Sequence, residues 1–94
     1  MQYDLDPMLA ENIIRLAKAY DISKVILFGS RARGDNHARS DIDLAVLGGN
    51  VSAFRYAVDE TTLLKFDVID LARDLSHNFR QSIAKEGVLI YAKT

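Results

Sequence analysis

The chain has 94 residues, a length that allows one compact domain, and we expect residues 1–94 to form it. A net charge of −1 argues against nucleic-acid binding driven by bulk charge, and the absence of cysteine excludes disulfides and cysteine-ligated metals. The sequence has neither a signal-peptide pattern nor an apolar run of about 18 residues, so we expect a cytoplasmic protein without a membrane segment.

The first half of the chain predicts a helix followed by two strands. An N-cap aspartate followed by proline, with apolar residues at helical spacing, predicts a helix over residues 7–20. The β-branched and aromatic run 24–29 predicts a central strand, and residues 40–49 predict a second one. The polar stretch 31–40 predicts a loop with at most a first helical turn. Because no long helix connects the two strands, we expect them to be antiparallel neighbours.

The second half predicts two amphipathic helices that alternate with two further strands. Asn50 is a candidate N-cap for the first helix, and residues 62–71 predict the third strand. Gly87 is the expected end of the second helix, and residues 88–91 predict a fourth strand. The resulting order, α-β-β-α-β-α-β, predicts an α+β fold with a small mixed four-stranded sheet and flanking helices. We expect the helices to cover one face of that sheet.

The second predicted strand carries two aspartates within an apolar run. Successive strand residues point to opposite faces of a sheet, so Ile42, Leu44 and Val46 share one face. This apolar face must be the one that the helices cover. Asp41 and Asp43 therefore project from the open face, about 6–7 Å apart along the backbone.

The third predicted strand places one more carboxylate on the open face. Leu64, Phe66 and Val68 form its buried face, so Asp67 points to the same side as the two aspartates of the second strand. Asp70 has the opposite parity, and we interpret it as a strand-end residue or a local cap. Strand parity thus selects three residues from a chain with 13 acidic ones.

Three carboxylates on one face repel one another unless cations neutralise them. Mg²⁺ prefers oxygen ligands and leaves positions open for substrate phosphates. Two such ions, about 3.5–4 Å apart, stabilise both the attacking and the leaving oxygen of a phosphoryl displacement. The third carboxylate, Asp67, is then placed to contact the attacking oxygen's metal and to accept its proton.

Gly29 and Ser30 add a candidate phosphate site. A glycine at the end of a buried strand lets the backbone approach a ligand, and a serine that opens a helical turn offers N–H groups and a hydroxyl to a phosphate. Arg31 is a candidate nucleotide-binding residue, and Arg33 could contact the same phosphates. The alternative, a solvated basic loop that includes Arg39, stays equally open.

These residues resemble the signature of the DNA polymerase β-like nucleotidyltransferase superfamily. Glycine-serine at 29–30, ten intervening residues and D-x-D at 41–43 match its G-S-x₁₀-D-x-D pattern. The segment FDVIDL at 66–71 is similar to the family's third-carboxylate strand, with Asp67 at the acid position. The resemblance covers roughly residues 10–92, and the short chain resembles the minimal nucleotidyltransferase branch, which includes the MntA-type antitoxins of HEPN-domain toxins.

The resemblance implies a Mg²⁺-dependent enzyme that transfers AMP from ATP and releases pyrophosphate. Asp41 and Asp43 would bind metal, Asp67 would complete the triad, and Gly29 with Ser30 would hold the triphosphate. The acceptor would be a tyrosine hydroxyl on a partner HEPN toxin, so the protein would act as an antitoxin. Larger relatives carry a second domain for the base or acceptor, so here acceptor binding is expected from a partner or a second copy.

Two other functions stay open. A degenerate relative could neutralise its toxin by masking the toxin's active site, although a pure binder has no need for three mutually repelling carboxylates. An active enzyme could instead modify a small molecule or an RNA end. The neutral charge argues against direct nucleic-acid binding, and the missing second domain argues against both acceptors.

The remaining conspicuous residues have simpler interpretations. We interpret His37 and His77 as surface residues and Asp74 as a helix cap. The apolar stripe in the last helix is interpreted as core or as a partner interface; it consists of Leu75, Phe79 and Ile83.

Overall fold

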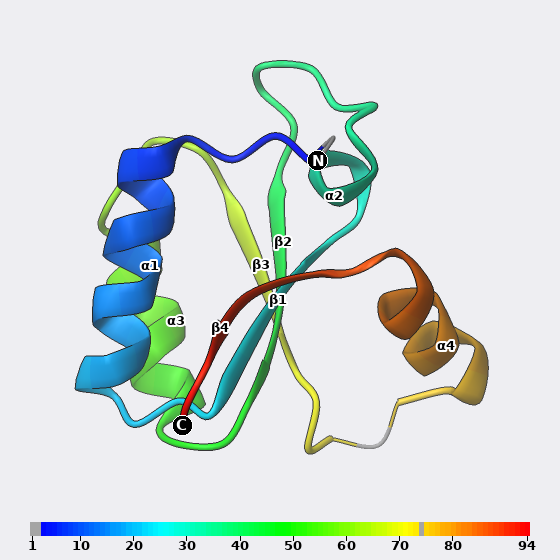
Figure 1. The fold of residues 1–94 in the computed structure, drawn as a ribbon. Coiled ribbons are helices and arrows are strands. Elements are labelled where there is room, and N and C mark those ends of the chain that lie inside the picture. The colour runs from blue at the N-terminus through cyan, green and yellow to red at the C-terminus, as the bar shows by residue number, and fades with distance from the viewer. Residues whose placement is uncertain (1–2, 74) are drawn as a thin grey trace.

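The computed structural model describes residues 3–73 and 75–94, and its elements follow the predicted order (Figure 1). A one-turn helix, α2, begins the stretch predicted as a loop. Within the described residues, no helix has the length and apolarity that a membrane crossing requires. The elements are α1 (Pro7–Ala19), β1 (Lys24–Phe28), α2 (Ser30–Arg33), β2 (Ile42–Leu47), α3 (Val51–Asp59), β3 (Phe66–Asp70), α4 (His77–Glu86) and β4 (Val88–Ala92).

The strands form a four-stranded mixed sheet in the order β3-β2-β1-β4. Strand β1 pairs antiparallel with β2, which confirms the prediction, and antiparallel with β4 on its other side. Strands β2 and β3 are parallel. Because β1 runs against β2 and β3, its last residue and the first residues of the other two lie at the same end of the sheet.

Helices α1 and α3 cover one face of the sheet and enclose the main core (Figure 1). Leu27 and Leu44 are fully buried there, together with Ile13 of α1 and Phe54 of α3. The apolar parity predicted for the second and third strands is therefore confirmed. Asp43 of β2 and Asp67 of β3 have the opposite parity and point away from this core.

Capping residues determine where the helices begin and end. Pro7 is the first residue of α1, and the side chain of Asn50 accepts a hydrogen bond from the backbone N–H of Ala53 at 3.1 Å. Gly87 ends α4, as predicted. Pro7 and Asn50 thus account for the starts of α1 and α3, although the Asp6 side chain makes no capping hydrogen bond, and Gly87 ends α4 in an extended conformation.

Helix α4 lies on the other face of the sheet, so the expectation that the helices cover one face is wrong for this element (Figure 1). The ring of Phe79 meets the ring of Phe28 edge-to-face, with centroids 5.7 Å apart. Ile83 and Ala45 are buried but lie outside the main core cluster. The physical reason is that this face carries apolar residues such as Phe28 and Ala45 besides the aspartates, and they need a cover of their own.

Strand β3 begins at Phe66, later than the predicted residue 62. The segment before it forms local hydrogen bonds instead: the Thr61 N–H donates to the Val58 carbonyl at 3.1 Å, and the Leu64 N–H donates to Thr62 Oγ1 at 3.3 Å. Such side-chain and turn bonds compete with strand pairing.

Candidate functional site

Three strands bring the predicted site residues to one end of the sheet. Phe28, the last residue of β1, lies opposite Asp43 in β2, and Asp43 lies opposite Asp67 in β3. Gly29 and Ser30 follow directly after β1. Residues directly opposite each other in a sheet point to the same face. Asp67 therefore lies beside Asp43, where strand parity predicted it.

Asp43 is half-buried, whereas Asp41 and Asp67 are exposed. Burial raises the pKa of the Asp43 carboxyl above its usual value, and the negative charges of Asp67 and Asp41 raise it further. The charge of Arg33 lowers this pKa, but it is the smallest contribution. The three carboxylates thus interact electrostatically, and a bound cation would relieve their repulsion.

Gly29 has a backbone conformation and surroundings that only glycine fits. Its φ is 77° and its ψ is −156°, a region essentially restricted to glycine. A Cβ at this position would overlap the Asp43 carboxylate, with Oδ2 as the nearest atom. The missing side chain therefore lets β1 end directly against one of the three carboxylates.

Ser30 opens a helical turn, as predicted. It is the first residue of α2, and Gly34 ends this turn with a left-handed φ of 83°. The N–H groups of Arg33 and Gly34 donate to the carbonyls of Gly29 and Ser30 at 3.2 and 2.8 Å. The N–H groups of the earlier residues in the turn have no acceptor within the helix. Phosphate binding by these groups stays a prediction.

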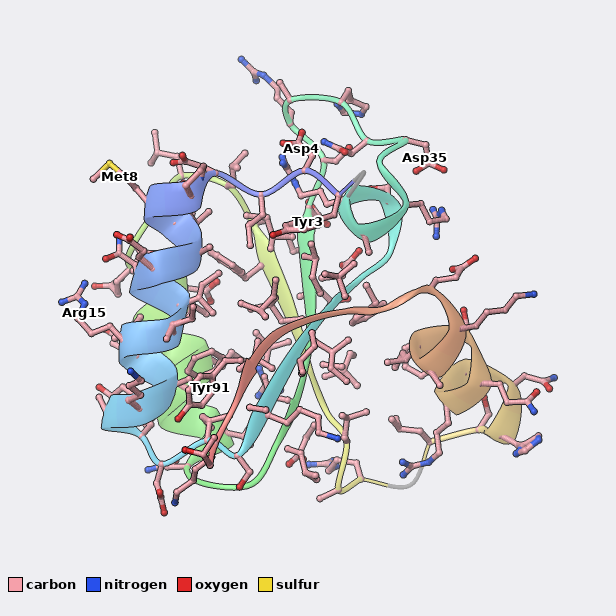
Figure 2. The ribbon with its side chains drawn as sticks, in the orientation of Figure 1. Tyr3, Asp4, Met8, Arg15, Asp35 and Tyr91 are labelled. Carbon is pink, nitrogen blue, oxygen red and sulfur yellow. The ribbon has the colours of Figure 1, made fainter. Side chains whose placement is uncertain are left out.

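Arg31 lies in a different environment from the one that we expected. The residue is only 5% exposed, and its guanidinium donates to the carbonyls of Ser40 and Ala38, both at 3.1 Å. It also donates to the Asp4 carbonyl at 3.4 Å and pairs with the Asp4 carboxylate at 3.6 Å. Figure 2 shows Asp4 beside the loop that follows α2. The Arg31 side chain thus joins this loop to the N-terminal segment, and its contact with a nucleotide stays a prediction.

Arg33 is the arginine whose charge acts on Asp43. Its exposed guanidinium pairs with Asp35 at 3.0 Å and with Glu86 at 3.5 Å. The hydrogen bond from Arg33 to Asp35, more than any other interaction, raises the pKa of Arg33. A helix at the start of the predicted loop would have assigned different environments to Arg31 and Arg33. Residues two apart on a helix point in different directions, so the two side chains cannot share one contact surface.

Asp70 lies outside the site, as interpreted. Its Oδ1 accepts a hydrogen bond from the Ala72 N–H at 2.9 Å, so it caps the turn after β3. His37 and His77 are exposed. The interpretation of Asp74 falls outside the described residues; the N-cap of α4 is Ser76, whose Oγ accepts from the Phe79 N–H at 3.1 Å.

A cavity of about 450 Å³ lies beside the carboxylates. Asp41 is part of its wall, and the other lining residues come from the loop before β2 and from the segment before β3. They are Arg39, Leu63, Leu64 and Lys65. No sequence pattern pointed to this cavity, because it depends on the late start of β3.

The carboxylates suit magnesium by their chemistry, although they do not form a closed cage. In the part of the chain that the structure describes, no three histidine or acidic side chains come together closely enough to hold a metal ion by themselves. Mg²⁺ is usually held by one or two carboxylates together with water and substrate phosphates. Asp41, Asp43 and Asp67 therefore fit an ion that binds jointly with a nucleotide.

Comparison with known proteins identifies the family by sequence. The family described as "Polymerase beta, Nucleotidyltransferase" matches residues 11–94. A protein from Methanocaldococcus jannaschii, named "Putative protein adenylyltransferase", is 36% identical, and the matched region covers 74% of this chain and 79% of the relative.

Solved structures share the fold. A chain of a toxin–antitoxin complex determined with AMP-PNP superimposes with a TM-score of 0.75 at 24% identity, covering 89% of this chain and 73% of that one. A chain from the complex of a tri-AMPylated Shewanella oneidensis HEPN toxin with an MNT antitoxin gives a TM-score of 0.69 at 20% identity, with coverages of 92% and 71%.

Proposed function

Because this chain belongs to the polymerase β nucleotidyltransferase family, we propose that it transfers AMP from ATP to a hydroxyl group with the help of Mg²⁺. The observation that carries this proposal is the position of Asp43, which lies opposite Asp67 and directly against Gly29. A metal-binding pair of carboxylates next to a backbone turn that can receive phosphates is what a nucleotidyl transfer requires.

Each residue of the site has a role in the proposed reaction, and Asp67 has two. Asp41, Asp43 and Asp67 would hold Mg²⁺, for which we expect two ions, and the metal would supply positive charge against the phosphates. The acceptor oxygen bonds to the α-phosphorus while the bond from that phosphorus to the oxygen bridging to the β-phosphate breaks, so pyrophosphate leaves. Asp67 accepts the hydroxyl proton, and Gly29 with Ser30 binds the departing phosphates.

Replacing both Asp41 and Asp43 with asparagine tests the proposed chemistry. The double variant keeps the shape of both side chains but loses their charge, so transfer of AMP from radiolabelled ATP to a partner should fall by roughly 10²–10³-fold or more. Asp70→Asn is the matched control, because it makes the same chemical change in a turn outside the site. Transfer by the double variant at the wild-type rate would refute the mechanism.

The acceptor that we propose is a tyrosine hydroxyl of a HEPN toxin, which makes this chain an antitoxin. The shared fold with chains of toxin–antitoxin complexes supports this choice, including the complex in which the toxin is tri-AMPylated. Intact-mass analysis of a HEPN partner after incubation with ATP and Mg²⁺ should show the gain of AMP. An unchanged mass in a partner that is nevertheless neutralised would favour masking by binding alone.

A further inference from the structure

The cavity beside Asp41 has no role in the chemistry derived so far. It encloses about 450 Å³, and Asp41 links it to the proposed site. A backbone hydrogen bond joins the two segments that line the cavity: the Ile42 N–H donates to the Lys65 carbonyl at 2.9 Å, where β2 and β3 begin. Lys65 is therefore held next to Asp41 across the two parallel strands.

The sheet order places this cavity and the phosphate-binding turn on opposite sides of the carboxylates. Along the order β3-β2-β1, Lys65 precedes β3, Asp41 precedes β2, and Gly29 follows β1. In a phosphoryl transfer, the attacking and leaving oxygens lie roughly in line through the phosphorus. When the leaving phosphates occupy the Gly29–Ser30 turn, the acceptor must enter from the β3 side. Asp67, the proposed proton acceptor, lies on that side as well.

The lining of the cavity combines apolar and cationic side chains. Leu63 is fully exposed, at 106% of its reference area, and Leu64 next to it is half-buried. Covering an exposed leucine side chain with a partner removes apolar surface from water and so favours binding. Arg39 and Lys65 are exposed, and neither forms an ion pair with another residue of the described ranges. Both can therefore pair with carboxylates of a docking partner.

We propose that this cavity binds the acceptor segment of a partner protein, in which a tyrosine is flanked by acidic residues. The proposal rests on the proposed function and names the substrate class for the same site. Leu63 and Leu64 contact the aromatic ring, Arg39 and Lys65 pair with the flanking carboxylates, and the hydroxyl faces Asp41. The covalent step is the one given above: the tyrosine oxygen bonds to the α-phosphorus, pyrophosphate leaves, and Asp67 takes the proton.

Charge reversal at the cavity tests this assignment. The probes are two peptides that each contain one tyrosine and differ only in its neighbours, which are glutamates in one peptide and lysines in the other. With ATP and Mg²⁺, the wild-type chain should modify the glutamate peptide about tenfold faster, measured by mass spectrometry. The double variant Arg39→Glu, Lys65→Glu should prefer the lysine peptide. Arg15→Glu, which changes an exposed cation on α1, should keep the wild-type preference (Figure 2).

A second variant addresses the apolar part of the cavity. Leu63→Asn changes a fully exposed side chain, so the fold does not depend on it. It should raise the KM for the glutamate peptide about fivefold or more while the affinity for ATP stays unchanged.

The outcomes separate this inference from the function on which it rests. A preference for the glutamate peptide that survives the charge reversal overturns the inference. Loss of ATP affinity in any of the cavity variants also overturns it, because the cavity then holds the nucleotide. Wild-type protein that cleaves ATP to AMP and pyrophosphate but modifies neither peptide also overturns the inference. Wild-type protein that does not cleave ATP under any of these conditions contradicts the proposed function itself.

Discussion

At the scale of single residues, Asp43 combines a poor environment for a charge with a central position in the site. Its carboxyl is half-buried between two other acidic side chains, and Gly29 leaves room for it only because the glycine has no Cβ. Ionised Asp43 therefore destabilises the metal-free fold. Functional sites commonly contain such groups, whose charge is favourable only when the ligand is bound.

Asp43→Asn should raise the free energy of unfolding at pH 7 when divalent ions are absent. The folded-state pKa of Asp43 is raised, so the folded protein is most stable, with respect to this group, below the ordinary pKa of 3.8, where the carboxyl is protonated. That stability is lost as the pH rises through the folded-state pKa and the carboxyl ionises. The advantage of the variant should therefore shrink as the pH falls toward 3.8. Urea unfolding of the variant and the wild type in EDTA, across this pH range, measures the difference in their free energies of unfolding. An advantage that does not change with pH would contradict the electrostatic explanation.

At the scale of elements, α4 supports the strands that carry the site. Its Phe79 packs against Phe28, and Phe28 lies directly opposite Asp43. Ile83 is 4% exposed on the same helix. On the face that bears the carboxylates, α4 thus packs against β1 beside Asp43, while Asp41 and Asp67 stay exposed. This arrangement leaves the carboxylates accessible and shields apolar side chains of the same face from water.

Ile83→Ala should lower the free energy of unfolding by about 2–4 kcal/mol, because it leaves a cavity under α4. Ser82→Ala is the control, since the neighbouring side chain is exposed. Chemical denaturation of the two variants and the wild type gives the comparison. If the two substitutions changed the unfolding midpoint equally, α4 would not be packed against the sheet as the structure shows.

At the scale of the whole molecule, Arg31 joins segments that are far apart in the sequence. It ties α2 to the loop before β2 and to Asp4 near the N-terminus, and the Asp4 N–H donates to the Arg31 carbonyl at 2.8 Å. That loop leads directly into Asp41. The buried arginine thus sets the position of one proposed metal ligand relative to the proposed phosphate-binding turn.

Arg31→Ala should lower the free energy of unfolding by roughly 2–3 kcal/mol, because several carbonyl acceptors lose a charged donor. Arg31→Lys should recover only part of the loss, since one ammonium group cannot replace the planar guanidinium. Arg15→Ala, at an exposed position on α1, is the control. Denaturant titration measures all three, and equal stability of Arg31→Ala and the wild type would refute the role.

Most of the architecture could be predicted from the sequence because its signals are local. Period-2 alternation separates Asp67 from Asp70, and the caps at Pro7, Asn50 and Gly87 mark helix ends. The spacing between the glycine-serine pair and the D-x-D motif indicated the family that the comparison confirms. These features depend on residue type and neighbouring positions alone.

The remaining features were decided by packing between distant segments. Alternation predicts two faces for a strand but cannot show which helix covers each, so the position of α4 came only with the structure. Arg31 and Arg33 are the same residue type in one polar stretch, so the sequence does not distinguish them. Only the folded chain buries Arg31 and places the charge of Arg33 where it acts on Asp43. The cavity beside Asp41 likewise arises from two segments that meet in space, which no local pattern encodes.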